Sequence, residues 1–345
     1  MSIITIKEYT TLIFPKYLDN SNKIGVTAPS AGVTKEGDHT RFHNGCTALK
    51  TKGYDVTFTD NVFTSDPYGR SSDKETRARE FMSLITDTSI DYIVSAKGGD
   101  FLAEMLPLID YDIIKKNPKW VQGYSDNTSL LFSITTLCDI ATVYSYHFGN
   151  FGMNTWHKSI ADNISILEGK LKKQTSFDMY QNSFDDNTSG FCFTDKVMLK
   201  SGRKTNEEIF EGRLIGGCLD VLVDIAGTKY ENAAGFAEKY ADDGIIWYME
   251  SFDAVGERII INLWKLKELG WFKNVKGFIF GRPCFYKSFS DLSYMDAVMT
   301  ALSEYNVPVI FDADIGHREP QWTMINGAKA KIHYDNGKAT IVYIY

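Results

Sequence analysis

Cysteine is scarce in this sequence, and the five cysteines are scattered along the chain: Cys46, Cys138, Cys192, Cys218 and Cys284. Their number is odd, and no Cys-x-x-Cys pair occurs. This pattern argues against both a disulfide framework and a zinc site. It fits free thiols in a reducing compartment, so we expect a cytoplasmic protein without a metal.

The sequence also lacks long apolar runs and any excess of positive charge. No segment reaches the roughly 18 apolar residues that a membrane-spanning helix needs. Met1–Phe14 has Lys7 and Glu8 inside its apolar stretch and lacks a small-residue cleavage site, so we expect no signal peptide. The net charge of -7 leaves no basic face for phosphates. We therefore expect neither nucleic acid nor a membrane as a partner.

What is present is an ordinary globular composition, with 43% hydrophobic and 23% charged residues in 345. This length suffices for two domains. The first half alternates between strand and helix patterns. The expected strands are Lys23–Ala28, Tyr54–Thr59, Asp91–Ala96, Lys119–Gln122 and Ala141–Ser145, and the expected helices are Asp38–Gly53, Asp73–Asp87, Phe101–Leu108 and Asn127–Cys138. Strands separated by crossover helices predict a parallel, doubly wound sheet.

The second half has a similar but shorter pattern. Strands are expected at Gly244–Met249, Lys276–Phe280 and Val307–Phe311, helices at Gly256–Leu269 and Ser290–Tyr305, and a closing hairpin at Lys329–Tyr334 and Ala339–Tyr345 around an Asn-Gly turn. Residues 150–210 are rich in Asn, Ser, Asp and Gly. We therefore predict an N-terminal domain over 1–165, a linker and insert loop over 166–210, and a smaller C-terminal α/β domain with mixed strands over 211–345.

Ser125 is the first candidate for chemistry. The segment Trp120–Thr128 runs from an apolar strand through Gly123 into an amphipathic helix, with the serine at the corner. A serine there exposes its hydroxyl and has its N–H at a helix start, which suits a nucleophile that attacks a carbonyl. Ligands of doubly wound sheets bind beyond the strand ends, where Ser30 and Gly98–Gly99 are also expected.

A nucleophilic serine needs a general base and a carboxylate that orients it. Among the six histidines, His317 is the best candidate, because it lies in a polar, glycine-containing loop after an apolar strand. A loop histidine bonded to backbone is the plain alternative. Glu250 closes the apolar strand IIWYM, where a carboxylate is either desolvated at a cost or paired.

The other five histidines have simpler explanations. His39 and His43 lie four residues apart on one helix face, a metal-like spacing that no third ligand completes, so a surface helix is expected. His147 follows the fifth strand and lines the crevice or has a structural role. His157 and His333 are expected at the surface and in the terminal hairpin.

A tetrahedral intermediate needs N–H donors for its oxyanion. The N–H of Asp126, directly after the serine, is one candidate, and Gly99 in the Lys97–Gly98–Gly99 loop is the other. Glycines let backbone approach a substrate closely. A plain strand-to-helix turn or a phosphate cradle is the alternative, but no dinucleotide or phosphate-loop fingerprint is present. The Gly-x-Ser-x-Gly elbow is also incomplete, because Asn127 replaces the second glycine.

Six segments in order resemble the LD-carboxypeptidase family of serine peptidases, which includes the microcin C immunity peptidases. They are Gly25–Ser30, Lys97–Gly99, Gly123–Leu130, Gly212–Gly217, Met249–Ser251 and Ile315–His317. The resemblance covers nearly the whole chain. It implies a Ser125–His317–Glu250 triad and an oxyanion hole of the Gly99 and Asp126 amides. Ser30 and Gly98, expected at the same strand ends, are weaker candidates for substrate binding. The resemblance further implies a Rossmann-like N-terminal domain, a groove between the domains, a homodimer and no metal or other cofactor.

Two branches of that family compete for the substrate. One removes the terminal D-alanine from muropeptide tetrapeptides, and the other cleaves an amide between aspartate and a modified nucleotide. The insert before Gly212 favours the second branch, but no tryptophan lies between Trp156 and Trp247 to stack on a base. Phe184, Phe191 or Phe193 could replace it. Cys218 stands where the family usually has asparagine, which puts one local hydrogen bond in doubt.

The primary hypothesis is a serine carboxypeptidase acting on muropeptides, and the immunity-type peptidase is the alternative. A different amidase on the same scaffold is a further enzymatic reading. A third, of another class, is a ligand-binding protein without chemistry, since a doubly wound domain with a hinged partner can simply hold a small molecule.

Overall fold

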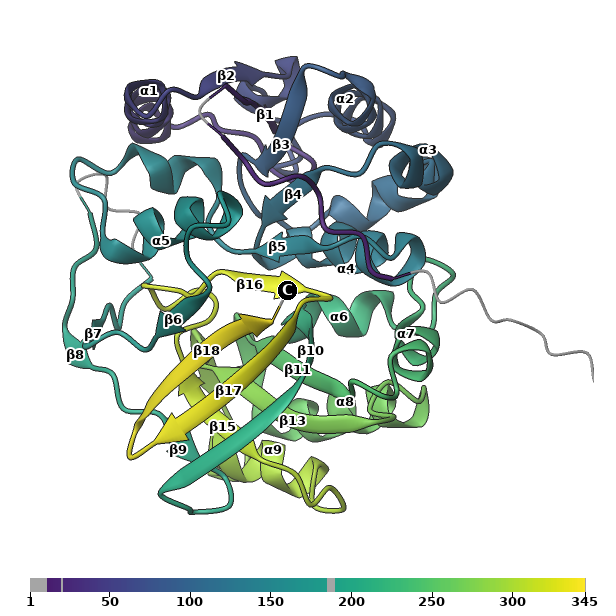
Figure 1. Ribbon diagram of the computed structural model, residues 1–345, viewed down its shortest axis with the longest axis vertical. Helices are drawn as coiled ribbons and strands as arrows, with labels where there is room; N and C mark the ends of the chain where they lie inside the picture. Colours follow the sequence, from purple (N-terminus) through teal and green to yellow (C-terminus); the bar gives the residue numbers. More distant parts are fainter. Residues whose placement is uncertain (1–10, 20, 185–189, 345) are drawn as a thin grey trace, which may run out of the picture.

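The computed structural model describes residues 11–19, 21–184 and 190–344. The expectation for Met1–Phe14 therefore falls largely outside the described residues, as does part of the Asn- and Asp-rich insert. Among the described residues, the strands form one six-stranded and one eight-stranded sheet, plus two small ladders (Figure 1).

The first sheet has the order β16-β5-β4-β3-β1-β2 and is parallel except for β16. Its strands are β1 (Lys23–Thr27), β2 (Asp55–Phe58), β3 (Ile90–Ser95), β4 (Trp120–Gly123), β5 (Thr142–Tyr144) and β16 (Met324–Asn326). The strand order changes side between β1 and β3: β2 is added on one side of β1, and β3 to β5 are added on the other. Doubly wound sheets bind ligands at such a switch point. The predicted parallel doubly wound sheet is confirmed.

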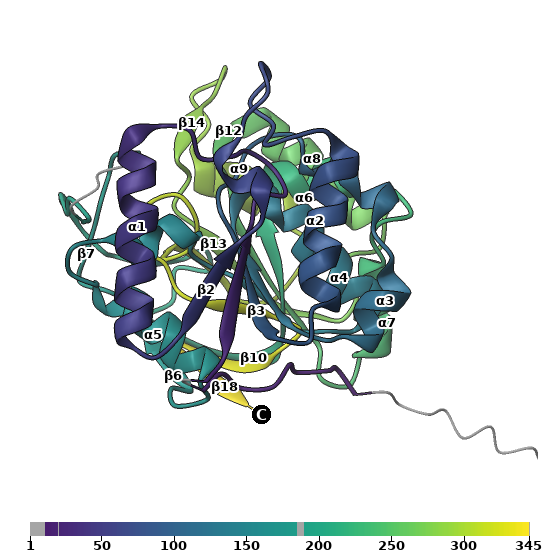
Figure 2. The same cartoon turned by 90° about the horizontal axis from the view of Figure 1, so that it is seen from above.

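Helices cover both faces of this sheet, with α1 and α5 on one side and α2 and α4 on the other (Figure 2). The helical segments are α1 (Glu36–Thr51), α2 (Lys74–Thr86), α3 (Tyr111–Lys116), α4 (Thr128–Cys138) and α5 (Lys158–Leu167), with 3-10 turns η1 (Asp60–Phe63), η2 (Leu102–Leu108), η3 (Ser125–Asn127) and η4 (Phe148–Gly152). Asp73 begins α2 by accepting a hydrogen bond from the Thr76 N–H at 2.6 Å.

The second sheet has the order β6-β18-β17-β10-β11-β13-β15-β9. Its strands are β6 (Lys173–Thr175), β9 (Lys200–Ser201), β10 (Glu207–Cys218), β11 (Ile245–Glu250), β13 (Val275–Gly281), β15 (Val309–Ala313), β17 (Lys329–Asp335) and β18 (Lys338–Ile344). Strands β10, β11, β13 and β15 are mutually parallel, and the outer strands are antiparallel. The predicted mixed second sheet is confirmed.

The remaining elements are α6 (Leu219–Ile225), α7 (Ala233–Lys239), α8 (Gly256–Glu268), α9 (Tyr294–Ala301), β7 (Met179–Tyr180), β8 (Asp195–Lys196), β12 (Asp253–Val255) and β14 (Phe285–Lys287). The predicted helix Ser290–Tyr305 was too long, because only its middle is helical. The hydroxyl of Ser288 and the N–H of Ser290 donate to Glu257 and hold the preceding segment outside the helix, and Ser293 caps its start.

The segment predicted as linker and insert contributes strands to the second sheet: β6 pairs with β18, and β9 pairs with β15. Helix α5 extends past residue 165. In addition, β16 leaves the C-terminal part and pairs with β5 of the first sheet. The boundaries at 165 and 211 stay predictions.

The two sheets meet along α4 and β10. Phe132 of α4 stacks on Trp271 at 4.9 Å between ring centroids, and Trp271 stacks on Trp247 of β11 at 5.4 Å. All three rings are buried. Gly217 makes this approach possible, because a Cβ there would overlap the side chain of Thr128 at the start of α4. Burial of large aromatic surfaces thus joins the two halves.

The neighbouring Gly216 yields a test of the close packing of β10 against β11 within the second sheet. A Cβ at this position would overlap the carbonyl oxygen of Tyr248 on the adjacent strand. We expect Gly216→Ala to lose about 3 kcal/mol of unfolding free energy, because backbone cannot move aside as a flexible side chain can. Urea denaturation measures this loss.

Gly69→Ala is the matched control. Gly69 has a φ of 93°, but an added Cβ would meet open space there. Only its backbone strain of about 1 kcal/mol should appear. Equal losses in the two variants would contradict the packing argument.

Candidate active site

Ser125 lies at the turn between β4 and α4 in a left-handed conformation, with a φ of 61°. This conformation costs a residue with a side chain about 1–2 kcal/mol, and such strain concentrates at functional sites. Asn127, which replaces the expected second glycine, holds the turn: its amide donates to the carbonyls of Lys97 and Tyr124, each at 3.1 Å. Asn127 thus ties the serine corner to the loop after β3.

Glu250 ends β11, and His317 lies in the loop that follows β15. The Nδ1 of His317 and the Oε2 of Glu250 lie 2.9 Å apart. The carboxylate is fully buried and the histidine is 5% exposed. Phe252 and Tyr124 pack against the imidazole, with ring centroids at 4.7 and 5.2 Å. The two residues expected to act as base and orienting carboxylate are therefore in direct contact.

The surroundings keep this buried carboxylate ionised. Burial by itself would raise the pKa of Glu250. The charge and hydrogen bond of His317, with the hydrogen bonds of Tyr144 and Cys218, together outweigh burial, so the pKa of Glu250 stays below its usual value. An ionised carboxylate can accept the Nδ1–H of a neutral imidazole, which leaves Nε2 with a lone pair.

One pocket of about 250 Å³ brings the sequence-predicted residues together. Its walls include Ser125, His317, Gly98 and Gly99. A wider groove of about 440 Å³ adjoins it and shares Gly99 and Ser125. The expected convergence at the strand ends is thus observed for these residues, with Glu250 behind His317.

Ser30 and Asp126 lie beneath this pocket rather than in its wall. The Ser30 hydroxyl donates to the carboxylate of Asp126, which also accepts the Leu102 N–H at 2.9 Å. Both side chains are buried, and burial raises the pKa of Asp126. A Cβ on Gly99 would overlap the Ser30 hydroxyl. The three loops that carry Ser30, Gly99 and Ser125 are therefore interlocked.

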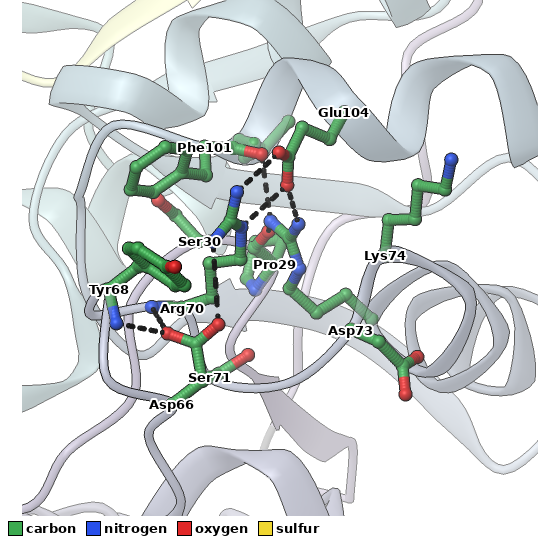
Figure 3. A network of polar contacts seen from close by, with 12 residues as sticks. Pro29, Ser30, Asp66, Tyr68, Arg70, Ser71, Asp73, Lys74, Phe101 and Glu104 are labelled. Atoms are coloured by element: carbon green, nitrogen blue, oxygen red, sulfur yellow. Dashed lines mark hydrogen bonds and ion pairs between the residues drawn. The ribbon is translucent and has the colours of Figure 1, made fainter.

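A polar network outside the pocket supports the same loops (Figure 3). The guanidinium of Arg77 is fully buried and donates to the carbonyls of Pro29 and Phe101 at 3.0 and 2.8 Å. Glu104 lies 2.6 Å from Arg77 and accepts two hydrogen bonds from Arg70, at 2.8 and 2.7 Å. Arg70 also lies face-on over the Phe101 ring at 4.0 Å.

His147 lines the pocket as well, beside the serine. Its ring stacks on Tyr124 at 4.1 Å, and its Nε2 lies 3.1 Å from the Asn127 amide nitrogen. Burial lowers the pKa of His147 to about 3, so this imidazole remains neutral at ordinary pH. His147 therefore shapes the pocket wall.

The remaining histidines lie elsewhere. His39 stacks on Phe63, His157 caps α5 and contacts Phe177, Phe191 and Phe193, and His333 pairs with Glu207. Within the described residues, no group of three His, Cys, Asp or Glu side chains could hold a metal ion.

Two positions that the sequence singled out have clear surroundings. The buried Cys218 donates its N–H to the Thr128 hydroxyl at 2.9 Å, and its thiol contacts Asp220 at 3.4 Å. Of the three insert phenylalanines, Phe184 reaches the pocket, 6.0 Å from the His317 ring. Phe191 and Phe193 pack against His157 instead. The stretch 185–189 of the predicted insert lies outside the described residues.

Sequence reasoning missed Tyr144, whose hydroxyl donates to the Oε1 of Glu250 at 2.6 Å. Phe252 against His317 was also missed. Tyr144 ends β5 and Phe252 lies two residues after β11, so position at a strand end was the available signal. The pairing of Tyr144 with Glu250 spans the two sheets, so no local pattern could have indicated it.

Two family models match the chain. The model described as the LD-carboxypeptidase N-terminal domain matches residues 24–145, and the model described as the LD-carboxypeptidase C-terminal domain matches residues 211–332. The chain belongs to the LD-carboxypeptidase family. It is therefore a hydrolase of the serine carboxypeptidase type.

Individual relatives in this family extend over nearly the whole chain. The microcin C7 self-immunity protein of Escherichia coli is 28% identical over 335 residues, 93% of each chain. The probable murein peptide carboxypeptidase of Bacillus subtilis is 23% identical over 331 residues, 95% of this chain and 93% of the relative. The solved structure of the microcin C7 self-immunity protein in complex with aspartyl sulfamoyl adenosine has a TM-score of 0.80 at 25% identity, covering 96% of this chain and 99% of that one.

Muramoyltetrapeptide carboxypeptidase from Oxalobacter formigenes has the same fold, with a TM-score of 0.70 at 18% identity over 93% of this chain and 98% of that one.

In the described part of this LD-carboxypeptidase family member, no helix is both long and apolar enough to cross a bilayer.

The buried guanidinium under the pocket loops yields a prediction. Arg77→Met would leave the Pro29 and Phe101 carbonyls without their donor, so we expect a loss of about 3 kcal/mol in unfolding free energy. Urea denaturation measures it. Arg79→Met on the exposed face of the same helix should stay within about 0.5 kcal/mol of wild type. Similar losses at both positions would contradict a special role for Arg77.

Proposed function

We propose that the enzyme hydrolyses amides through Ser125 as nucleophile, His317 as general base and Glu250 as the orienting carboxylate. The observation that carries this proposal is the contact of 2.9 Å between Glu250 and His317. The imidazole of His317 lines the same pocket as Ser125. Because Nδ1 of His317 is engaged by Glu250, Nε2 is the nitrogen available to the serine.

The proposed reaction has two stages. The Ser125 oxygen attacks the scissile carbonyl carbon while His317 takes the serine proton, and the N–H groups of Gly99 and Asp126 stabilise the oxyanion. His317 then gives the proton to the leaving nitrogen as the C–N bond breaks, and an acyl ester remains on Ser125. Water then attacks the ester carbon and loses a proton to His317. The bond between this carbon and the serine oxygen breaks, the carboxylic acid product leaves, and His317 returns the proton to the serine oxygen.

We propose a muropeptide tetrapeptide as substrate, from which the terminal D-alanine is removed. The relative named as a probable murein peptide carboxypeptidase supports this choice. The adjoining groove of about 440 Å³ gives room for a peptide beside Ser125. Gly98 lies against the serine and is proposed to contact the substrate, whereas Ser30 would act from below through Asp126.

An aspartyl–nucleotide amide is the second candidate substrate. Phe184, Phe252 and Phe285 contact one another beside His317, with ring centroids 5.2–6.1 Å apart. Such faces can stack on a base, so Phe184 is proposed in the role of the missing tryptophan. The relative solved with aspartyl sulfamoyl adenosine supports this alternative.

The proposal also includes cytoplasmic location, a homodimer and the three-part division 1–165, 166–210 and 211–345. The five cysteines are free thiols, which is consistent with a reducing compartment. Light scattering on the purified protein would measure the assembly state. No metal or organic cofactor takes part in the proposed steps.

The proposed nucleophile can be tested by removing its hydroxyl. Ser125→Ala should reduce turnover by about 10⁴-fold or more, because no attacking oxygen remains, while the fold is retained. Mass spectrometry would follow a muropeptide tetrapeptide and an aspartyl–nucleotide phosphoramidate side by side. Release of D-alanine supports the primary substrate, and release of the nucleotide supports the alternative.

A serine-directed fluorophosphonate separates catalysis from simple binding. The wild-type enzyme should form a covalent adduct at Ser125, with loss of fluoride. A native protein that never becomes labelled would favour a ligand-binding protein without chemistry and would overturn the proposed function.

The proposed general base can be tested in the same way. His317→Ala should lower kcat by about 10³- to 10⁴-fold, because the triad acts as a unit. His157→Ala, which changes a histidine outside the pocket, is the control and should retain activity. Near-wild-type rates for His317→Ala would show that another group serves as base.

A further inference from the structure

Tyr144 occupies the point where the two sheets meet. It ends β5, pairs with Gly123 of β4 on one side and with Met324 of β16 on the other, and is fully buried. Its hydroxyl lies 2.6 Å from the Oε1 of Glu250 and 3.2 Å from the backbone nitrogen of Ser125. One phenol thus contacts both the carboxylate and the backbone of the proposed nucleophile.

The direction of both hydrogen bonds follows from the groups involved. An ionised carboxylate can only accept, and a backbone N–H can only donate. The phenol therefore gives its single proton to Glu250 and accepts the Ser125 N–H on its oxygen. Burial, followed by the charge of Glu250, raises the pKa of Tyr144 well above its usual value, so the proton stays on the phenol.

The two oxygens of Glu250 thereby have different partners. Oε2 faces His317 at 2.9 Å, and Oε1 accepts from Tyr144 at 2.6 Å. Short hydrogen bonds to a charged oxygen are the stronger kind, and two of them fix the plane of the carboxylate. A fixed plane fixes the direction in which the imidazole is held.

The second contact acts on the serine itself. Ser125 has a strained φ of 61°, and its N–H is directed at the phenol. Because this N–H is engaged by the phenol, the proposed oxyanion donors remain the N–H groups of Gly99 and Asp126.

We propose that Tyr144 is a positioning residue that couples the Glu250–His317 pair to the backbone of Ser125 across the two sheets. This inference rests on the proposed function, because it presumes that the three residues act together.

Tyr144→Phe removes only the hydroxyl. We expect kcat to fall about 10- to 100-fold with a small change in KM, the scale of one lost hydrogen bond to a charged group. The phenol stabilises the anionic form of the pair, so proton binding to the pair becomes easier without it. The acid limb of the rate profile should therefore move to higher pH by roughly one unit.

Other groups near Glu250 remain the same in this comparison. The ionisable neighbours that face it are His317, Cys218, Asp220, Cys284 and Tyr294, in addition to Tyr144. None of them changes in Tyr144→Phe, so the difference from wild type reports the hydroxyl alone.

Tyr248→Phe is the matched control. Tyr248 is fully buried on β11, its ring centroid lies 5.8 Å from that of Tyr144, and its hydroxyl donates to Asn326 at 2.7 Å. This variant should keep kcat within about twofold and leave the acid limb in place. If Tyr144 had a purely structural role, Tyr144→Phe would still lower kcat, but the acid limb of its rate profile would stay in place.

The pH dependence of fluorophosphonate labelling makes the test independent of the substrate. If the wild type is not labelled, the proposed function fails and the role of Tyr144 falls with it. If the wild type and folded Tyr144→Phe are labelled with the same rate and the same acid limb, the proposed function stands and the positioning role is wrong.

A second variant covers the case in which Tyr144→Phe does not fold. Site-specific 3-fluorotyrosine at position 144 keeps the hydroxyl but makes it a stronger donor. It should stabilise the anionic pair further and move the acid limb to lower pH, opposite to Tyr144→Phe. An unmoved limb in this variant would also overturn the proposal.

Discussion

The hydrogen bond between Glu250 and His317 requires a carboxylate to keep its charge with no exposure to water. Such a charge is stable only if its surroundings supply compensating donors. Here the donors come from both halves of the chain: the imidazole from the loop after β15 and the phenol of Tyr144 from β5. Correct packing of the two sheets is therefore a condition for ionisation of Glu250, and ionisation is a condition for the proposed base.

The arrangement of the sheets places two residues of the proposed triad, Ser125 and Glu250, at strand ends. In each sheet, the parallel strands direct their carboxyl ends toward the same region, where Ser125 follows β4 and Glu250 ends β11. Rigid strand ends hold these side chains more firmly than free loops would. The hydrogen bonds of Asp126 and of the buried Arg77 restrict the loops that carry Ser30, Gly99 and Ser125.

Local patterns predicted much of this molecule. Apolar runs and crossover helices indicated the first sheet, and the strand-to-helix corner indicated Ser125. Pairings between distant residues were beyond such patterns. The position of β16 beside β5 depends on residues up to 184 apart in sequence, as in the pairing of Thr142 with Asn326, and the Tyr144–Glu250 bond spans 106 residues. The helix expected from Ser290 was shortened by Glu257, which binds the segment before α9 from another helix. Which of the three insert phenylalanines reaches the pocket likewise depends on tertiary packing, which places Phe184 there and the other two against His157.

The pairing of β16 from the C-terminal part with β5 of the first sheet has a consequence for how the protein folds during synthesis. During synthesis the N-terminal part emerges first, yet β5 stays an open sheet edge until residues 324–326 leave the ribosome. Tyr144 lies on that edge, and its carboxylate partner arrives more than 100 residues after it. A growing or prematurely ended chain thus carries Ser125 without Glu250 and His317, so the proposed triad is complete only when translation is nearly finished.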